Sequence, residues 1–232
     1  MRRLLVICLV IPLLAGCGTG AERMVAAPQP AARPVRLLVV GDSLSVGYYA
    51  SDLGASYVTL LQQGLDRRGL SVSTTLIAKA GVTAVDASQW RLGIPSDDIV
   101  VELGTNDYGD SVPLSSFQAA YDTILWALRR AAPQANLYCL GTWSNPAEVN
   151  RTGATAGMYD TVIQSSCHIA RGDYVDLSPF YEQTGNHGPA GAATYLGTSD
   201  WFHPNDAGHD AIAELLLQVI SVGTRPDAAG PA

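Results

Sequence analysis

The sequence has little that would connect it with nucleic acid. Its 232 residues carry a formal net charge of -7, and no segment gathers arginine and lysine into a basic cluster. A protein that binds nucleic acid needs such a patch to meet the phosphate backbone. We therefore expect no nucleic-acid partner.

Long apolar runs are also missing after the first residues. Only residues 4–14 are continuously apolar, and this run is too short to span a bilayer. Arg2 and Arg3 precede it, and Leu14-Ala15-Gly16-Cys17 follows, which resembles the bacterial lipobox. That resemblance implies cleavage before Cys17 and attachment of lipid to its thiol. The alternative is an ordinary secretory signal, and with either signal the protein is exported. We interpret residues 1–16 as a lipoprotein signal peptide, and we expect the lipid alone to hold the protein at the cell envelope.

Two further segments lack apolar periodicity. Residues 17–34 and 223–232 are rich in alanine, proline and glycine, which is typical of a disordered tether and a disordered tail. Residues 35–222 lie between them, and their number suits one domain with a substantial core. We find no internal repeat and expect a single monomeric domain.

Cysteine is scarce, with four residues in the chain. Cys8 lies in the apolar run and Cys17 is the expected lipid site, which leaves Cys139 and Cys167. In an oxidising compartment this pair can form a disulfide, or the two can remain separate buried thiols. No cysteine or histidine spacing is typical of a metal site, and we expect neither a metal nor another cofactor.

Strand-like and helix-like segments alternate along the domain. Apolar runs that suit buried strands occupy residues 36–40, 70–78, 98–103, 136–140 and 174–177. Helical periodicity is found from Tyr57 to a stop near Gly69 and over residues 84–92, 115–131, 155–170 and 206–222. This alternation predicts an α/β protein with a doubly wound, mostly parallel five-stranded sheet. Ligands bind such sheets at the carboxyl ends of the strands.

A serine follows the first predicted strand directly. Gly41 permits a sharp turn after residues 36–40, and Ser43 comes two residues later. A helix that begins there would direct its backbone N–H groups toward a developing negative charge. Taken alone, this segment allows two interpretations, in which Ser43 is either a helix cap or a nucleophile.

A carboxylate and an imidazole near the end of the chain favour the nucleophile. Asp200 precedes His203 by three residues, so in a tight turn it can accept a hydrogen bond from Nδ1–H. This bond fixes the tautomer and leaves Nε2 free to take the proton of Ser43. An oxyanion needs fixed donors, and the backbone N–H groups of Ser43 and Gly81 with the side-chain amide of Asn106 can supply three.

Four motifs now occur in a fixed order. They are Gly41-Asp42-Ser43-Leu44, Gly81, Gly104-Thr105-Asn106-Asp107 and Asp200-Trp201-Phe202-His203. From about Arg36 to the final helix the chain resembles the SGNH (GDSL-type) serine hydrolases, although Ala80 stands where many relatives have asparagine. The resemblance implies a flavodoxin-like three-layer α/β/α sandwich. It also implies Ser43 as nucleophile, His203 as base, Asp200 as its orienting carboxylate, and Ser43, Gly81 and Asn106 as oxyanion donors.

We interpret the other polar residues near these motifs as structural. Asp42 and Asp107 are expected to fix loops by accepting backbone N–H bonds. His209 is expected to pack or cap locally, and His168 to lie at a helix end. His187, in a glycine-rich loop, has no feature that supports a role in the cleft.

The sequence therefore predicts a serine esterase that works through an acyl-enzyme. Substrate alternatives are a carbohydrate O-acetylesterase and an acyl hydrolase of the lysophospholipase or thioesterase kind, so the expected partner is a small acyl ester or an acetylated glycan. The non-enzyme alternative is a surface binding module with an inactive site. Aromatic residues near the motif loops either stack on sugars or pack the loop bases: Tyr48, Tyr49, Tyr108, Trp143 and Trp201. The loop over residues 178–199 is the expected specificity element.

Overall fold

The computed structural model describes residues 33–220. The predicted signal peptide, most of the tether, the lipid site Cys17 and the tail after residue 222 lie outside these residues. Within them, no helix is both long enough and apolar enough to cross a membrane.

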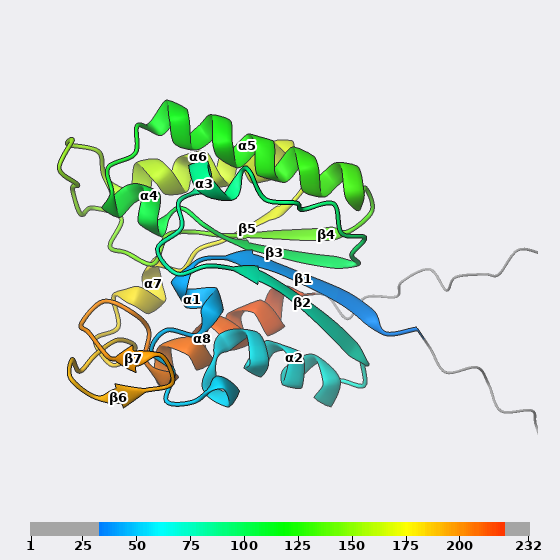
Figure 1. Ribbon diagram of the computed structural model, residues 1–232, viewed down its shortest axis with the longest axis horizontal. Helices are drawn as coiled ribbons and strands as arrows, with labels where there is room; N and C mark the ends of the chain where they lie inside the picture. The colour runs from blue at the N-terminus through cyan, green and yellow to red at the C-terminus, as the bar shows by residue number, and fades with distance from the viewer. Residues whose placement is uncertain (1–32, 221–232) are drawn as a thin grey trace, which may run out of the picture. The chain divides into compact units, whose positions relative to one another are not determined.

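A five-stranded parallel sheet forms the centre of the domain (Figure 1). Its strand order is β2-β1-β3-β4-β5, and every neighbouring pair is parallel. The strands are β1 (Val35–Gly41), β2 (Val72–Ala78), β3 (Asp98–Glu102), β4 (Asn136–Leu140) and β5 (Asp173–Val175). The predicted α/β class and the five predicted strands are confirmed.

Helices cover both faces of the sheet and bury two separate apolar cores (Figure 1). One face carries α2 (Tyr57–Arg67) and α8 (Asp206–Val219), and the other carries α3 (Ala84–Ala87), α5 (Leu114–Ala131) and α6 (Ala156–Ile169). Side chains alternate along β1, so that Leu37 and Val39 pack beneath α2 and α8. Leu38 and Val40 pack on the opposite side. This period of two explains why a continuous apolar run can serve both cores.

The structure differs from the prediction in its short elements. The helix predicted over residues 84–92 ends at Ala87, because the N–H of Trp90 donates to the Ala87 carbonyl and tightens the chain into a turn. The glycine-rich loop contains α7 (Ser178–Tyr181) and a hairpin of β6 (Ala193–Thr194) and β7 (Gly197–Thr198). Short helices also follow two strands: α1 (Ser43–Val46) after β1 and α4 (Thr105–Gly109) after β3.

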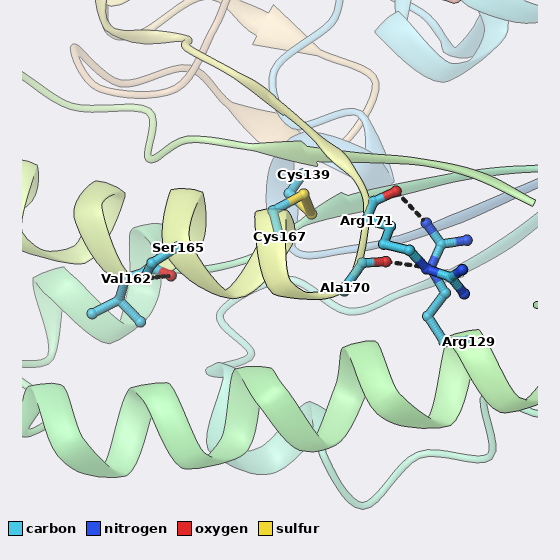
Figure 2. The surroundings of a disulfide bond; sticks show 7 residues. All are labelled: Arg129, Cys139, Val162, Ser165, Cys167, Ala170 and Arg171. Atoms are coloured by element: carbon cyan, nitrogen blue, oxygen red, sulfur yellow. Dashed lines mark hydrogen bonds between the residues drawn. A yellow bond between two sulfur atoms is a disulfide. The ribbon is translucent and has the colours of Figure 1, made fainter.

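A disulfide joins Cys139 of β4 to Cys167 of α6, with Cα atoms 6.1 Å apart (Figure 2). The sequence left a disulfide and two separate thiols open. Figure 2 also shows Arg129 of α5 at the end of α6, where it donates to the carbonyls of Ala170 at 2.6 Å and Arg171 at 2.8 Å. The C-terminal end of α6 is therefore fixed covalently to the sheet and by hydrogen bonds to α5.

Candidate active site

The turn after β1 presents Ser43 at the carboxyl edge of the sheet. Asp42 caps α1, since its Oδ1 accepts from the N–H of Leu44 at 3.1 Å. Gly41 is required here for space, because a Cβ at this position would lie 1.9 Å from Ser45 Oγ. The turn thus depends on a close approach that only glycine permits.

Ser43, His203 and Asp200 form one hydrogen-bonded chain. His203 Nε2 lies 3.0 Å from Ser43 Oγ, and His203 Nδ1 lies 2.9 Å from Asp200 Oδ2. An ionised carboxylate can only accept, so Nδ1 carries the proton and Nε2 is left as an acceptor for the serine hydroxyl. Ser43 Oγ is also 3.3 Å from Asp42 Oδ1, which makes Nε2 the nearer of its two acceptors.

Asp200 is held in its ionised form. Burial by itself would raise the pKa of its carboxyl, but three donors outweigh that effect and lower the pKa below its ordinary value. These donors are the N–H of His203 at 2.8 Å, the N–H of Phe202 at 2.8 Å and the ring Nδ1–H of His203. The carboxylate therefore both shapes the loop and fixes the imidazole.

Aromatic rings surround His203. The Tyr49 ring meets it edge-on at 4.9 Å, and the rings of Tyr48 and Phe202 lie 5.7 Å and 5.3 Å away. Trp143 is fully buried below this loop, and its Nε1–H donates to the Phe202 carbonyl at 2.8 Å. Trp143 therefore packs a loop base, one of its two predicted alternatives, and connects the segment after β4 to the loop that carries His203.

Two backbone donors near Ser43 are unoccupied. Within the part of the chain that the structure describes, neither Ser43 N nor Gly81 N donates a hydrogen bond to another residue. Gly81 has a φ of 74° with open space where a side chain would stand. Asn106 differs, because its Nδ2 already donates to Asp42 Oδ2 at 2.8 Å and to the Val82 carbonyl at 3.0 Å. Both amide hydrogens of the predicted third donor thus have acceptors.

A buried carboxyl that the sequence analysis did not identify lies under the serine turn. Glu102 ends β3, and its Oε2 accepts from Ser45 Oγ at 2.8 Å, Asp42 N at 3.1 Å and Ser45 N at 3.3 Å. Tyr57 OH lies 2.6 Å from Ser45 Oγ and continues the network. Burial and the neighbouring Asp42 carboxylate raise the pKa of Glu102 well above its usual range. A carboxylate directly after the apolar run Ile99-Val100-Val101 and before Leu103 was the signal that could have revealed it.

The aspartates of the motif loops fix backbone, as predicted. Burial raises the pKa of Asp42 to about 6 and that of Asp107 to about 6. Asp107 Oδ2 accepts from the N–H of Ala84 at 2.8 Å and so anchors the start of α3. Its Oδ1 is buried and has no hydrogen-bond partner among the described residues.

The remaining histidines lie outside this chain of hydrogen bonds. His209 is buried on α8, where its Nε2 bonds the Tyr48 carbonyl at 2.8 Å and its Nδ1 accepts from Tyr57 N at 3.3 Å. Its predicted packing role is confirmed. His168 is exposed on α6, and His187 stacks on Tyr181 with ring centroids 5.1 Å apart. Residues 33–220 contain no cluster of three or more side chains suited to holding a metal ion.

This site and fold correspond to a class of ester hydrolases. The model of the GDSL-like lipase/acylhydrolase family matches residues 39–211. The chain belongs to this family and is a hydrolase that acts on ester bonds. None of the curated protein sequences matches it.

Several solved structures share the fold at low sequence identity. A carbohydrate esterase family 2 enzyme with a carbohydrate-binding domain, from Corynascus thermopiles (Myceliophthora fergusii), is 17% identical with a TM-score of 0.62; the match covers 83% of this chain and 67% of that one. TesA is 23% identical with a TM-score of 0.61, over 79% and 96% of the two chains. AlinE4, an SGNH-hydrolase family esterase, is 22% identical with a TM-score of 0.53, over 62% and 76%.

Proposed function

We propose that this protein is a serine esterase that cleaves acyl esters through an acyl-enzyme on Ser43. The observation that carries the proposal is the continuous chain from Ser43 Oγ through His203 to Asp200, with distances of 3.0 Å and 2.9 Å. Ser43 Oγ attacks the carbonyl carbon while its proton passes to His203 Nε2. Asp200 stabilises the imidazolium that forms.

The proposed reaction then proceeds in two balanced halves. The tetrahedral intermediate collapses, the C–O bond to the alcohol breaks, and His203 returns the proton to the leaving oxygen. Water attacks the acyl-enzyme in the second half, again giving its proton to His203, and the carboxylic acid leaves as Ser43 regains its hydrogen. The free N–H groups of Ser43 and Gly81 would stabilise both oxyanions, and Asn106 would join them by turning one hydrogen away from the Val82 carbonyl.

Single substitutions in each member test this mechanism. Ser43→Ala is expected to lower kcat for p-nitrophenyl acetate by at least about a thousandfold. Ser165→Ala is the matched control, because its hydroxyl only bonds the Val162 carbonyl at 3.1 Å on the surface of α6 (Figure 2). His168→Ala and Asp173→Asn serve the same purpose for His203→Ala and Asp200→Asn. Wild-type turnover by Ser43→Ala would refute Ser43 as the nucleophile, whereas a lack of ester turnover in the wild type itself would favour a binding module.

We also propose an acetylated glycan as a second, narrower substrate class. Trp201 is adjacent to Asp200 in the chain, yet 67% of its surface is exposed. Its ring packs against Gly188, where a Cβ would lie 2.5 Å from the ring. Gly188 also lines a pocket of about 340 Å³ with Tyr49 and residues of the β6–β7 hairpin. An exposed aromatic face beside such a pocket suits a sugar ring, and a carbohydrate esterase is among the proteins that share this fold.

The glycan candidate is tested by a ratio of substrates. Trp201→Ala is expected to lower kcat/KM for acetylated xylan about fivefold relative to p-nitrophenyl acetate, since one stacking contact is worth about 1 kcal/mol. Trp126→Ala is the matched control, because Trp126 is similarly exposed, at 61%, but lies on α5. An unchanged ratio in Trp201→Ala, or a preference for longer acyl chains, would favour the acyl hydrolase alternative.

We further propose that the protein is exported and anchored by lipid on Cys17. The Cys139–Cys167 disulfide supports export, because structural disulfides persist in oxidising compartments. Mass spectrometry of the mature N-terminus tests it: a diacylated Cys17 is expected, and a Cys17→Ala chain should no longer fractionate with membranes at high salt. An unmodified N-terminus at another residue would support the ordinary secretory signal.

A further inference from the structure

Arginines gather at the edge of the sheet where the parallel strands begin. Arg67 lies in the last turn of α2, and Arg129 and Arg130 lie in the last turn of α5. Arg171 precedes the first residue of β5 by two positions. Within residues 33–220, none of these four forms an ion pair with a carboxylate. Asp66 and Asp173 lie at the same edge, so the positive charge of the four arginines is only partly offset there.

The opposite edge, where the strands end, carries the acidic groups of the catalytic site. Asp42 and Asp107 follow the ends of β1 and β3, Glu102 is the last residue of β3, and Asp200 lies in the loop before α8, bonded to His203 beside Ser43. This difference between the two edges follows from the topology. The helices run antiparallel to the strands, so the C-terminal ends of the helices lie at the edge where the strands begin. The C-terminal end of a helix carries partial negative charge and so favours arginine. Although the protein as a whole is acidic, the edge where its strands begin can therefore attract anions.

Large apolar side chains are exposed beside these arginines. Trp126 on α5 and Ile169 on α6 are 61% and 78% exposed, and both line a groove of about 440 Å³ between the two helices. Arg129 and Arg171 line the same groove, and Figure 2 shows Arg129 reaching the end of α6 there. Asp122 is the one carboxylate among its lining residues. Arg130 stacks its guanidinium 4.5 Å from the Trp126 ring centre. An exposed tryptophan paired with a cation suits the boundary between lipid headgroups and acyl chains.

The chain also enters the domain at this edge. β1 begins at Val35, and Arg33 and Arg36 bind Asp97 at the start of β3, with distances of 2.8 Å and 3.0 Å. Figure 1 shows the described chain starting at the end of the sheet where β4 also starts. The segment between Cys17 and the domain therefore joins it on the side of the four arginines.

We propose that the basic edge, formed by Arg67, Arg129, Arg130 and Arg171 with Trp126 and Ile169, rests on the surface of an anionic phospholipid bilayer. Arg67, Arg130 and Arg171 meet the lipid phosphates, while Arg129 keeps its bonds to the carbonyls of Ala170 and Arg171. Trp126 and Ile169 enter the headgroup boundary. In this orientation Ser43 lies at the opposite edge of the sheet and faces away from the bilayer. The inference rests on the proposed lipid anchor for the presence of the bilayer.

Fluorescence quenching tests the contact with the full, lipidated chain. The protein is reconstituted in phosphatidylcholine vesicles with brominated acyl chains, with and without phosphatidylglycerol. Bromine quenches a tryptophan that enters the boundary, so Trp126→Phe should lose most of the quenching seen in wild type. Trp201→Phe, which removes an equally exposed ring at the catalytic edge, should keep it. Equal quenching in wild type and Trp126→Phe would overturn the proposal.

Charge substitutions test the electrostatic part. At low salt, Arg130→Gln and Arg171→Gln should each lower, by about fivefold, the ratio of domains that rest on the phosphatidylglycerol surface to domains that do not. Arg151→Gln, whose guanidinium lies near the Asp110 carbonyl beyond β3, should have no effect; an equal effect would overturn the assignment of this edge. Sedimentation with vesicles at high salt reports the anchor separately. Loss of sedimentation there, with Trp126 still quenched at low salt, would refute the anchor and support this surface.

Discussion

The carboxyl group of Glu102 accepts a hydrogen bond of 2.8 Å from the hydroxyl of Ser45, two residues beyond Ser43. Through this bond and those from the N–H groups of Asp42 and Ser45, the end of β3 holds the turn after β1 from below. The position of Ser43 therefore depends on a neighbouring strand as well as on its own turn.

Substitutions of Glu102 separate hydrogen bonding from charge. Glu102→Gln keeps an oxygen that can accept the same bonds, so we expect a folded enzyme with most of its kcat. Glu102→Leu leaves the N–H groups of Asp42 and Ser45 unpaired, at about 1–3 kcal/mol each, and should lower both the free energy of unfolding and kcat. Urea unfolding and p-nitrophenyl acetate kinetics measure the two effects. Equal stability and activity in the two variants would show that the network does not position Ser43.

Trp143→Phe tests the support of the loop that carries His203. The phenyl ring fills much of the same buried space but leaves the Phe202 carbonyl without its 2.8 Å donor. We expect the free energy of unfolding to fall by about 1–3 kcal/mol and kcat to fall more than KM changes. Trp90→Phe is a suitable control, since Trp90 packs at the other side of the domain near α3. A kcat equal to that of wild type would show that Trp143 does not position His203.

Asn106→Ala tests whether the side-chain amide of Asn106 stabilises the oxyanion in the transition state. A donor used only there lowers kcat by about a hundredfold or more when removed, with little change in KM. The existing bonds of Asn106 to Asp42 and Val82 predict a loss of stability in addition. If kcat is unchanged while stability falls, Asn106 is a structural link and the two backbone N–H groups form the oxyanion site alone.

The buried His209 predicts a dependence of stability on pH. Burial lowers its pKa to about 4, whereas an unfolded histidine titrates near ~6.5. Between these values the unfolded chain binds more protons, so the free energy of unfolding falls as the pH decreases, by at most about 3 kcal/mol. Asp42, Asp107 and Asp160, each with a pKa raised to about 6 by burial, act in the opposite direction over that range.

A comparison with His209→Gln isolates the histidine from those carboxyls. The difference in free energy of unfolding between wild type and His209→Gln should shrink as the pH is lowered from neutral toward 4. A difference that stays constant with pH would contradict a neutral, buried His209.

The disulfide should increase the free energy of unfolding, because it closes a loop and so restricts the unfolded chain. Cys139 and Cys167 are 28 residues apart, and a loop of this length predicts about 3–4 kcal/mol of stabilisation by restriction of the unfolded chain. The Cys139→Ala/Cys167→Ala variant should lose this amount in urea unfolding, and a reducing agent should destabilise only the wild type. Equal unfolding midpoints with and without reductant would contradict the bond.

The regular elements could be predicted because each has a local cause. The strand at residues 136–140 is an apolar run bounded by Pro133 and Gly141, and its bounds were predicted without error. The β6–β7 hairpin could not be predicted, because two-residue strands in a glycine-rich loop have no measurable period.

The residues of the site also fall into two groups, those that the sequence could predict and those that it could not. Asp200 and His203 are three residues apart, so their contact is local. Ser43 follows the end of β1, which places it at the carboxyl edge of the sheet, where such folds bind ligands. Glu102, Trp143 and the engaged hydrogens of Asn106 depend on which strands are neighbours and how their side chains pack. Those relationships arise only in the folded chain.

Covalent labelling of the nucleophile tests the central claim most directly. After incubation with diethyl p-nitrophenyl phosphate, mass spectrometry of peptides from the wild-type protein should place one diethylphosphoryl group on Ser43. His203→Ala should be labelled far more slowly, and Ser165→Ala at the wild-type rate. A label on another residue, or ester hydrolysis that persists while Ser43 is unmodified, would contradict the assignment of Ser43 as the nucleophile.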